Sequence, residues 1–159
     1  WEAMKKEDFL KGFEGSLNHY FTCTQAVSKY MLEQKFGTII NNASLFAFLA
    51  PCFPMHLDLN NAAAAHHVAA KGGALQLTRY LAALWAPVGI RVNAVSPGYF
   101  PQKRGPERPD YMREVTARIP MNRIGQPKEV AGTFVFLASE ASSYMTGQNI
   151  IIDGGYSIW

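Results

Sequence analysis

Residues 65–73 read AHHVAAKGG and residues 90–98 read IRVNAVSPG. The first stretch belongs to an alanine- and leucine-rich segment that ends before Pro87, which is typical of a helix. The second is an apolar, β-branched run that stops at Pro97-Gly98, which is typical of a buried strand followed by a turn. A helix that leads directly into such a strand predicts one unit of a parallel α/β sheet.

The same two patterns recur along the chain and predict one globular domain over residues 1–159. Apolar residues three and four apart predict helices, and short β-branched runs predict strands. The predicted helices are 6–34, 62–85, 111–118 and 127–139, the predicted strands are 38–41, 90–95 and 149–152, and the predicted loops are 45–60 and 97–109. This alternation predicts an α/β fold with a parallel, Rossmann-like, doubly wound sheet.

The predicted strand 38–41 is apolar enough to be buried, so we expect a neighbouring strand beyond it. In a doubly wound sheet that neighbour belongs to the other half of the fold. The chain starts at Trp1, without an initiator Met, and its first element is already a helix. We therefore expect the carboxyl-terminal half of such a fold, either numbered from inside a longer protein or truncated.

The composition narrows the classes of function. A hydrophobic content of 48% with 17% charged residues is that of a folded domain. A net charge of +3 does not favour nucleic-acid binding, and the longest apolar runs are too short to span a membrane. Two cysteines without metal or disulfide spacing favour a reducing compartment, so we expect a cytoplasmic protein.

Six short motifs follow one another: 37–41 leading to Ser44, 71–73 leading to 77–79, 89–94 leading to 97–98, 123–125, 136–139, and 146–148 leading to 153–155. Their order resembles the carboxyl-terminal half of a short-chain dehydrogenase/reductase along nearly the whole chain. The resemblance implies an oxidoreductase that acts on a secondary alcohol or ketone with NAD or NADP. The ending 153–159 is similar to members that act on sugar derivatives.

The resemblance also implies catalytic residues. In that family a tyrosine transfers the substrate proton, a lysine four residues later lowers the tyrosine pKa, a serine fixes the substrate oxygen and an asparagine completes a water relay. Ser44 and Lys71 match the serine and the lysine, whereas His67 stands at the tyrosine and Ser16 at the asparagine. The loop between Ser44 and His67 is longer than is usual in the family, which indicates an insertion. We therefore expect an impaired activity.

For the cofactor, the resemblance implies contacts from Lys71, Asn41 and the Pro97-Gly98 turn, with Gln102 where many members have a threonine. The glycine-rich turn that binds the cofactor pyrophosphate belongs to the half that the chain lacks. The residues present therefore leave the choice between NAD and NADP open.

His67 leaves two interpretations open. An imidazole can transfer protons near neutrality, but Lys71 one turn later lowers the His67 pKa if the two groups are close. The ring is also shorter than a phenol, so it falls short of a carbonyl placed for tyrosine. His67 is thus either a catalytic residue of altered chemistry or the mark of a lost tyrosine. A metal site is not expected, because His66 and His67 point about 100° apart on a helix.

Two functions therefore stay open. The leading one is an NAD(P)-dependent oxidoreductase of impaired activity, and the alternative is a catalytically silent homologue that assembles with an active subunit. In the family, the two long helices pack against those of a second subunit. Helices 6–34 and 62–85 keep apolar residues for such a homo- or hetero-oligomer, among them Leu17, Phe21, Leu75 and Leu81.

Residues 97–118 follow the strand end where cofactor and substrate meet in the family, and we expect them to form a lid over a small-molecule substrate. Lys103, Arg104 and Arg108 in this segment favour an anionic substrate, although they also fit an ordinary solvated surface.

Overall fold

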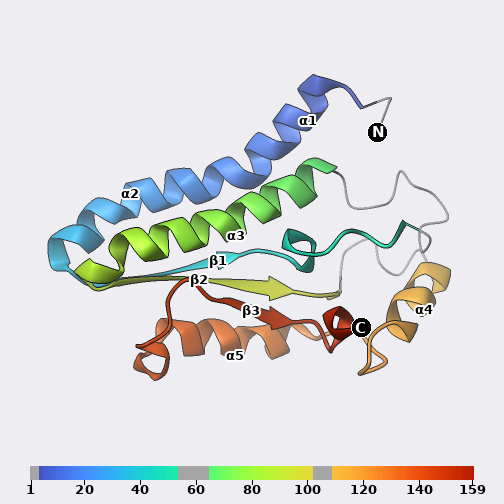
Figure 1. The fold of residues 1–159 in the computed structure, drawn as a ribbon. Coiled ribbons are helices and arrows are strands. Elements are labelled where there is room, and N and C mark those ends of the chain that lie inside the picture. The colour runs from blue at the N-terminus through green and yellow to red at the C-terminus, as the bar shows by residue number, and fades with distance from the viewer. Residues whose placement is uncertain (1–3, 54–64, 102–108) are drawn as a thin grey trace.

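A computed structural model describes residues 4–53, 65–101 and 109–159 and places three strands in one parallel sheet (Figure 1). Their order across the sheet is β1 (Gly37–Asn42), β2 (Ile90–Pro97) and β3 (Asn149–Ile152). Gly37 pairs with Ile90, and Ala94 pairs with Asn149. The predicted parallel sheet is confirmed. Strand β2 runs past its predicted end because Ser96 and Pro97 still pair with β3.

Helices cover both faces of the sheet, as a doubly wound fold requires (Figure 1). On one face lie α2 and α3, and on the other lies α5. The helices are α1 (Lys6–Phe13), α2 (His19–Gln34), α3 (Ala65–Trp85), α4 (Pro109–Ala117) and α5 (Pro127–Ala138). The predicted helix 6–34 is therefore present, but a π-helical turn, Glu14–Asn18, separates α1 from α2. Helix α2 ends at Gln34, as predicted, and the C-cap residue Lys35 is in left-handed conformation.

The core lies between the sheet and its helices. Ile90 and Val92 are fully buried against α3. Leu75 and Leu81 also belong to this core, with 4% and 8% of their surface exposed, so their assignment to an outer interface was wrong. Helical spacing correctly identified an apolar face on this helix. The part of the face that carries Leu75 and Leu81 covers the sheet.

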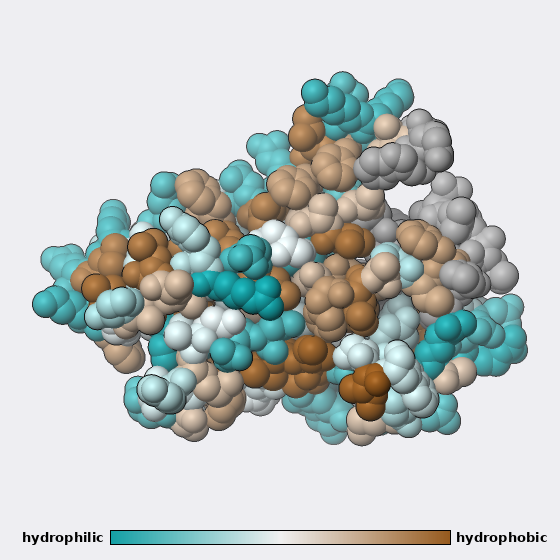
Figure 2. Space-filling model, in the orientation of Figure 1, coloured by the Kyte–Doolittle hydropathy of each residue, from teal (hydrophilic) through white to brown (hydrophobic). Residues whose placement is uncertain are grey.

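Other apolar side chains of the same helices remain at the surface. Phe21 and Tyr30 of α2 are 54% and 60% exposed, and Tyr80 and Leu84 of α3 are 64% and 52% exposed. Figure 2 shows hydrophobic patches on the face that it presents, over the outer ends of α2 and α3 and over β3 and α5.

Buried amide side chains tie the layers together. The Asn41 amide of β1 donates to Thr78 Oγ1 of α3 at 2.8 Å. The Asn93 side chain of β2 donates to the Met145 carbonyl at 2.9 Å and accepts from the Gln148 amide at 3.0 Å. These bonds satisfy polar groups that would otherwise be costly to bury.

Strand β1 forms one edge of the sheet within the described part of the chain, since only β2 pairs with it there. Ile39 and Ile40 are half-buried along this edge. A groove of about 410 Å³ runs beside it, lined by β1, by α2 and by Lys71 of α3. The neighbour predicted for this strand stays a prediction.

Candidate active site

The carboxyl ends of the three strands meet at one edge of the sheet because the strands are parallel. Asn42 ends β1, and Pro97 ends β2 and opens the Pro97-Gly98 turn. The Gly98 amide donates to the Ile152 carbonyl at 2.8 Å. A Cβ on Gly98 would lie 2.6 Å from Asp153 Cβ, so only glycine lets these two strand ends approach so closely. Ligands bind at this edge in open α/β sheets.

Ser44 lies just beyond β1 in extended backbone conformation. Its Oγ accepts a hydrogen bond from the Phe46 amide at 3.2 Å and thereby caps the short 3₁₀ turn Leu45–Ala47. That turn packs on α3, where Leu45 is buried. Ser44 is thus half-buried at the strand end, and no acceptor within the described residues takes its hydroxyl proton.

Lys71 reaches from α3 to the end of β1. Its Nζ donates to the Asn42 carbonyl at 2.6 Å and to Tyr20 Oη at 2.7 Å. Burial lowers the pKa of Lys71 because it penalises the charged ammonium. The structure therefore places this lysine at the strand end that also carries Ser44.

Tyr20 was not among the residues predicted for the site. Its side chain is only 7% exposed, and its hydroxyl donates to the Asn42 carbonyl at 2.5 Å. Burial raises the pKa of Tyr20, so the phenol stays protonated. A tyrosine within an amphipathic helix carries no local signal of such a role, because the contact joins residues from three different elements.

His67 lies one turn before Lys71 on α3. Its pKa is lowered, first by burial and then by the charge of Lys71 and by His66. The predicted effect of Lys71 is confirmed in direction, although burial contributes more. Within the described residues no hydrogen bond joins the His67 ring to Ser44 or Lys71. A neutral imidazole can accept a proton, but its protonated form is scarce near neutral pH.

His66 faces another neighbour. Its ring packs directly against the Cα of Gly12, where α1 approaches α3. This contact gives His66 a role in helix packing.

The remaining predicted residues fall into separate places. Ser16 is half-buried within the π-helical turn, a rare feature that is frequent at functional sites. Asn41 is buried and bound to Thr78, and its predicted contact with a cofactor stays a prediction. Gln102, Lys103, Arg104 and Arg108 lie outside the described residues.

Three tyrosines gather beside the Pro97-Gly98 turn. Tyr99 follows the turn, and its ring lies edge-on to Tyr156 at 5.2 Å and to Phe46 at 6.5 Å between centroids. Burial raises the pKa of Tyr99, and hydrogen bonds with Tyr156 and Tyr111 add to the effect. Since Tyr111 belongs to α4, this cluster fixes that helix next to the candidate site.

The described residues contain neither a metal-binding cluster nor a membrane-spanning helix. No group of three histidine, cysteine, aspartate or glutamate side chains there is arranged to hold a metal ion. None of the helices in the described ranges combines the length and apolar character needed to cross a membrane.

Comparison with known proteins gives the family. A family profile described as enoyl-(acyl carrier protein) reductase matches residues 1–157. The 3-oxoacyl-[acyl-carrier-protein] reductase FabG of Thermotoga maritima is 38% identical over 98% of this chain and 59% of its own length. The chain belongs to this family of short-chain dehydrogenases/reductases.

Solved structures agree with the assignment. A gluconate 5-dehydrogenase from Burkholderia cenocepacia, solved with NADP and tartrate, superposes with a TM-score of 0.89 at 30% identity, covering 99% of this chain and 59% of its own. A short-chain dehydrogenase from Leptospira borgpetersenii, solved with NAD+, gives 0.88 at 30% identity with the same coverage. The chain thus spans about three-fifths of the length of these relatives.

Proposed function

We propose that this chain supplies the catalytic half of an NAD(P)-dependent oxidoreductase that acts on a secondary alcohol or ketone, with an activity impaired by His67. The observation that carries the proposal is the Lys71 ammonium, held 2.6 Å from the Asn42 carbonyl at the strand end that leads to Ser44. This contact supports the roles that the family resemblance implies for Lys71 and Ser44.

The described residues fit the nicotinamide end of such a cofactor. Lys71 carries three N–H donors, and hydrogen bonds to Tyr20 and Asn42 use two of them. No acceptor among the described residues takes the third, so it would be open to a ribose hydroxyl, and the Pro97-Gly98 turn offers backbone at the same sheet edge. When bound, the nicotinamide accepts or supplies the hydride. Relatives solved with NADP and with NAD+ support either cofactor.

The protein residues would divide the remaining work. The Ser44 hydroxyl would hold the substrate oxygen, and neutral His67 would take the proton of an alcohol. Reduction of a ketone needs a protonated donor instead, and the lowered pKa of His67 makes that form scarce near neutral pH. We therefore expect slow turnover that favours alcohol oxidation.

For the substrate we propose a sugar acid or a similar anion. The relative from Burkholderia cenocepacia is a gluconate 5-dehydrogenase solved with tartrate, a dicarboxylate, and this supports the choice. The basic residues Lys103, Arg104 and Arg108 would supply the charge-assisted contacts. A cytoplasmic location belongs to the same proposal, and the free Cys23 and Cys52 are consistent with it.

A second candidate is a silent subunit that assembles with an active relative. The exposed aromatic side chains on α2 and α3 favour it, since Tyr30 and Tyr80 are both at least 60% exposed. The replacement at His67 would not affect this role.

The test is the change His67→Tyr in this chain joined to a nucleotide-binding half, followed by nicotinamide absorbance with gluconate-like and neutral substrates. Restoring a phenol one turn before Lys71 should raise turnover at least tenfold, an effect on the order of one general acid. The control is the double change His67→Tyr with Lys71→Met, which should lose the gain. If the parent already matches the tyrosine variant, His67 is a competent catalyst and the activity is not impaired. If no variant turns over, the silent-subunit function is favoured.

A further inference from the structure

Lys71 is hydrogen-bonded to Tyr20, a residue that lies outside all six sequence motifs. The Lys71 ammonium comes from α3 and the Tyr20 phenol from α2, and both bind the Asn42 carbonyl at the end of β1. The ammonium also lies 5.2 Å from the centroid of the Tyr20 ring. Three polar atoms from three elements therefore close one ring of hydrogen bonds.

The hydrogen-bond donors and acceptors in this ring are complementary. The phenol oxygen accepts a hydrogen bond from the Lys71 ammonium, and the phenol O–H donates one to the Asn42 carbonyl. Each donor in the ring therefore meets an acceptor. A hydrogen bond to an ionised group is stronger than one between neutral groups. Tyr20 therefore stabilises the charged form of Lys71 in a place where burial opposes that form.

The helix geometry brings Tyr20 into this position. Tyr20 lies one turn after Ser16, at the point where the π-helical turn gives way to α2. A π turn holds more residues than an α turn, so it rotates the helix that follows relative to the one before. Here α2 presents Tyr20 to the strand end, while α1 presents Gly12 to His66.

We propose that Tyr20 is a positioning residue that holds the Lys71 ammonium at the carboxyl end of β1. It does so from α2, whereas His67 occupies the position on α3 where the family has its tyrosine. The role of Lys71 in catalysis rests on the proposed function. The contact between Lys71 and Tyr20 does not.

Among the described residues, few other titratable groups surround this pair. From α3 come His67 and His66, and from α2 come His19, whose ring centroid lies 4.0 Å from that of Tyr20, and Cys23, which lines the groove. Strand β1 contributes a backbone carbonyl and no titratable side chain. A change at Tyr20 should therefore act on Lys71 mainly through the lost hydroxyl.

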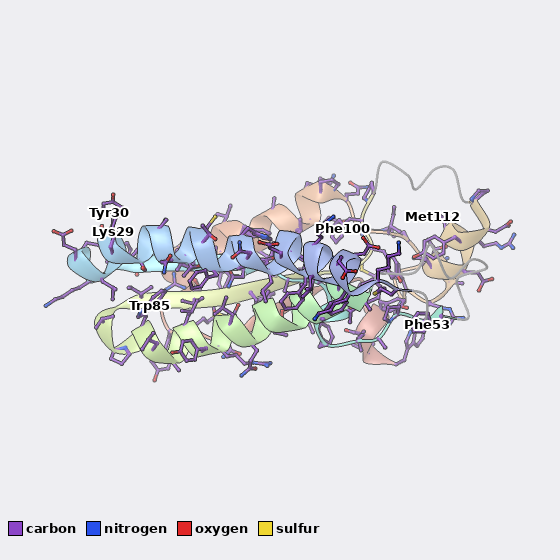
Figure 3. The ribbon with its side chains drawn as sticks, turned by 90° about the horizontal axis from the view of Figure 1, so that it is seen from above. Lys29, Tyr30, Phe53, Trp85, Phe100 and Met112 are labelled. Atoms are coloured by element: carbon purple, nitrogen blue, oxygen red, sulfur yellow. The ribbon has the colours of Figure 1, made fainter. Side chains whose placement is uncertain are left out.

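The experiment measures how fast each lysine of the full-length protein is acetylated by acetic anhydride between pH 6 and pH 11, with readout by peptide mass spectrometry. Tyr20→Phe keeps the ring and removes the acceptor. The free amine of Lys71 should then persist to lower pH, and its acetylation at pH 8 should rise roughly fivefold. The control is Tyr30→Phe, at the far end of the same helix, where Lys29 Nζ lies 4.7 Å from the ring centroid (Figure 3). It should leave the Lys71 profile unchanged.

Superimposable Lys71 profiles for the parent and a folded Tyr20→Phe would overturn the proposal. If Tyr20→Phe loses its circular dichroism spectrum, nuclear Overhauser contacts between Lys71 Cε protons and the Tyr20 ring in the parent decide the matter, and their absence rejects the pair. A separate arm adds NADH or NADPH to the parent joined to a nucleotide-binding half. If neither nucleotide protects Lys71 and the Lys71 profile still depends on Tyr20, the cofactor function is rejected and the positioning role remains.

Discussion

The charged form of Lys71 and the charged form of His67 are both opposed by burial, and they also repel each other. Replacing Lys71 by methionine should therefore raise the pKa of His67 part of the way towards its usual value, because burial, the larger cause, remains. The measurement is the pH titration of the His67 ring protons by NMR. Lys29→Met on α2 is the control and should leave the titration unchanged. An unaltered His67 titration in Lys71→Met would show that the two groups do not interact.

The same lowered pKa affects folding. The unfolded chain takes up the His67 proton at a higher pH than the folded chain does, so stability should fall as the pH drops below about 6.5. In Lys71→Met this fall should be shallower.

Gly12 and Gly132 offer a matched pair of helical glycines. A Cβ at Gly12 would collide with the His66 ring, whereas one at Gly132 would meet nothing within 4 Å. Gly12→Ala should lower the free energy of unfolding by about 1–2 kcal/mol through overpacking. Gly132→Ala should raise it by about 0.5–1 kcal/mol, since alanine restricts the unfolded chain. Denaturant unfolding measures both changes in the free energy of unfolding.

The added change His66→Ala should remove the effect of Gly12→Ala. Equal effects of the two glycine changes would contradict the packing of His66 on Gly12.

At the scale of elements, the start of α5 carries a capping box reinforced by an ion pair. Glu129 accepts from the Gln126 amide at 2.7 Å and from both terminal nitrogens of Arg123 at 2.7 and 2.8 Å. The hydrogen bond from Arg123 is the main reason that the pKa of Glu129 falls to about 2, and the Gln126 amide adds to it. The first turn of the helix is thus held by a carboxylate that is charged over nearly the whole pH range.

This arrangement predicts an acid-sensitive contribution to stability. The folded pKa lies below the unfolded one, so the contribution is complete above pH 4.5 and is lost as the pH falls towards 2. Glu129→Gln should flatten the loss of stability in that window, and it should do so less in high salt because the pair is exposed. The control is Glu140→Gln, an exposed carboxylate at another helical turn. Parallel acid unfolding curves for the parent and Glu129→Gln would refute the prediction.

Across the described part of the molecule, β1 pairs on one side only, and α2 and α3 carry exposed aromatic side chains. An edge with half-buried isoleucines invites pairing, so the chain alone should associate with itself. Light scattering over a range of concentrations measures this. The double change Phe21→Glu with Tyr80→Glu separates the surfaces, because association through β1 would survive it and association through α2 and α3 would not. A compact monomer at every concentration would contradict the prediction for both surfaces.

Prediction from the sequence succeeded where the signal is local. The strands around Ile39 and Val92 and the helix beginning at Pro127 follow from β-branched runs, turn residues and helix-capping positions that lie next to one another in the chain. The roles of Ser44 and Lys71 were predicted from a family resemblance and stay predictions, and the structure places both residues at the same end of the sheet. The burial of Leu75 was missed because helical spacing cannot tell a face that covers a sheet from one that meets a partner.

The sequence by itself thus determined the order and type of the elements and the family, because these depend on short-range periodicity and on motifs of a few residues. Only the tertiary structure decided that Tyr20 binds Lys71, that His66 packs on Gly12 and that, within the described residues, β1 pairs on one side only. Those contacts join residues from different elements, and they depend on how a π-helical turn rotates α2 and on how closely α1 and α3 pack. No local pattern encodes such rotations, since their energies arise only when the layers meet.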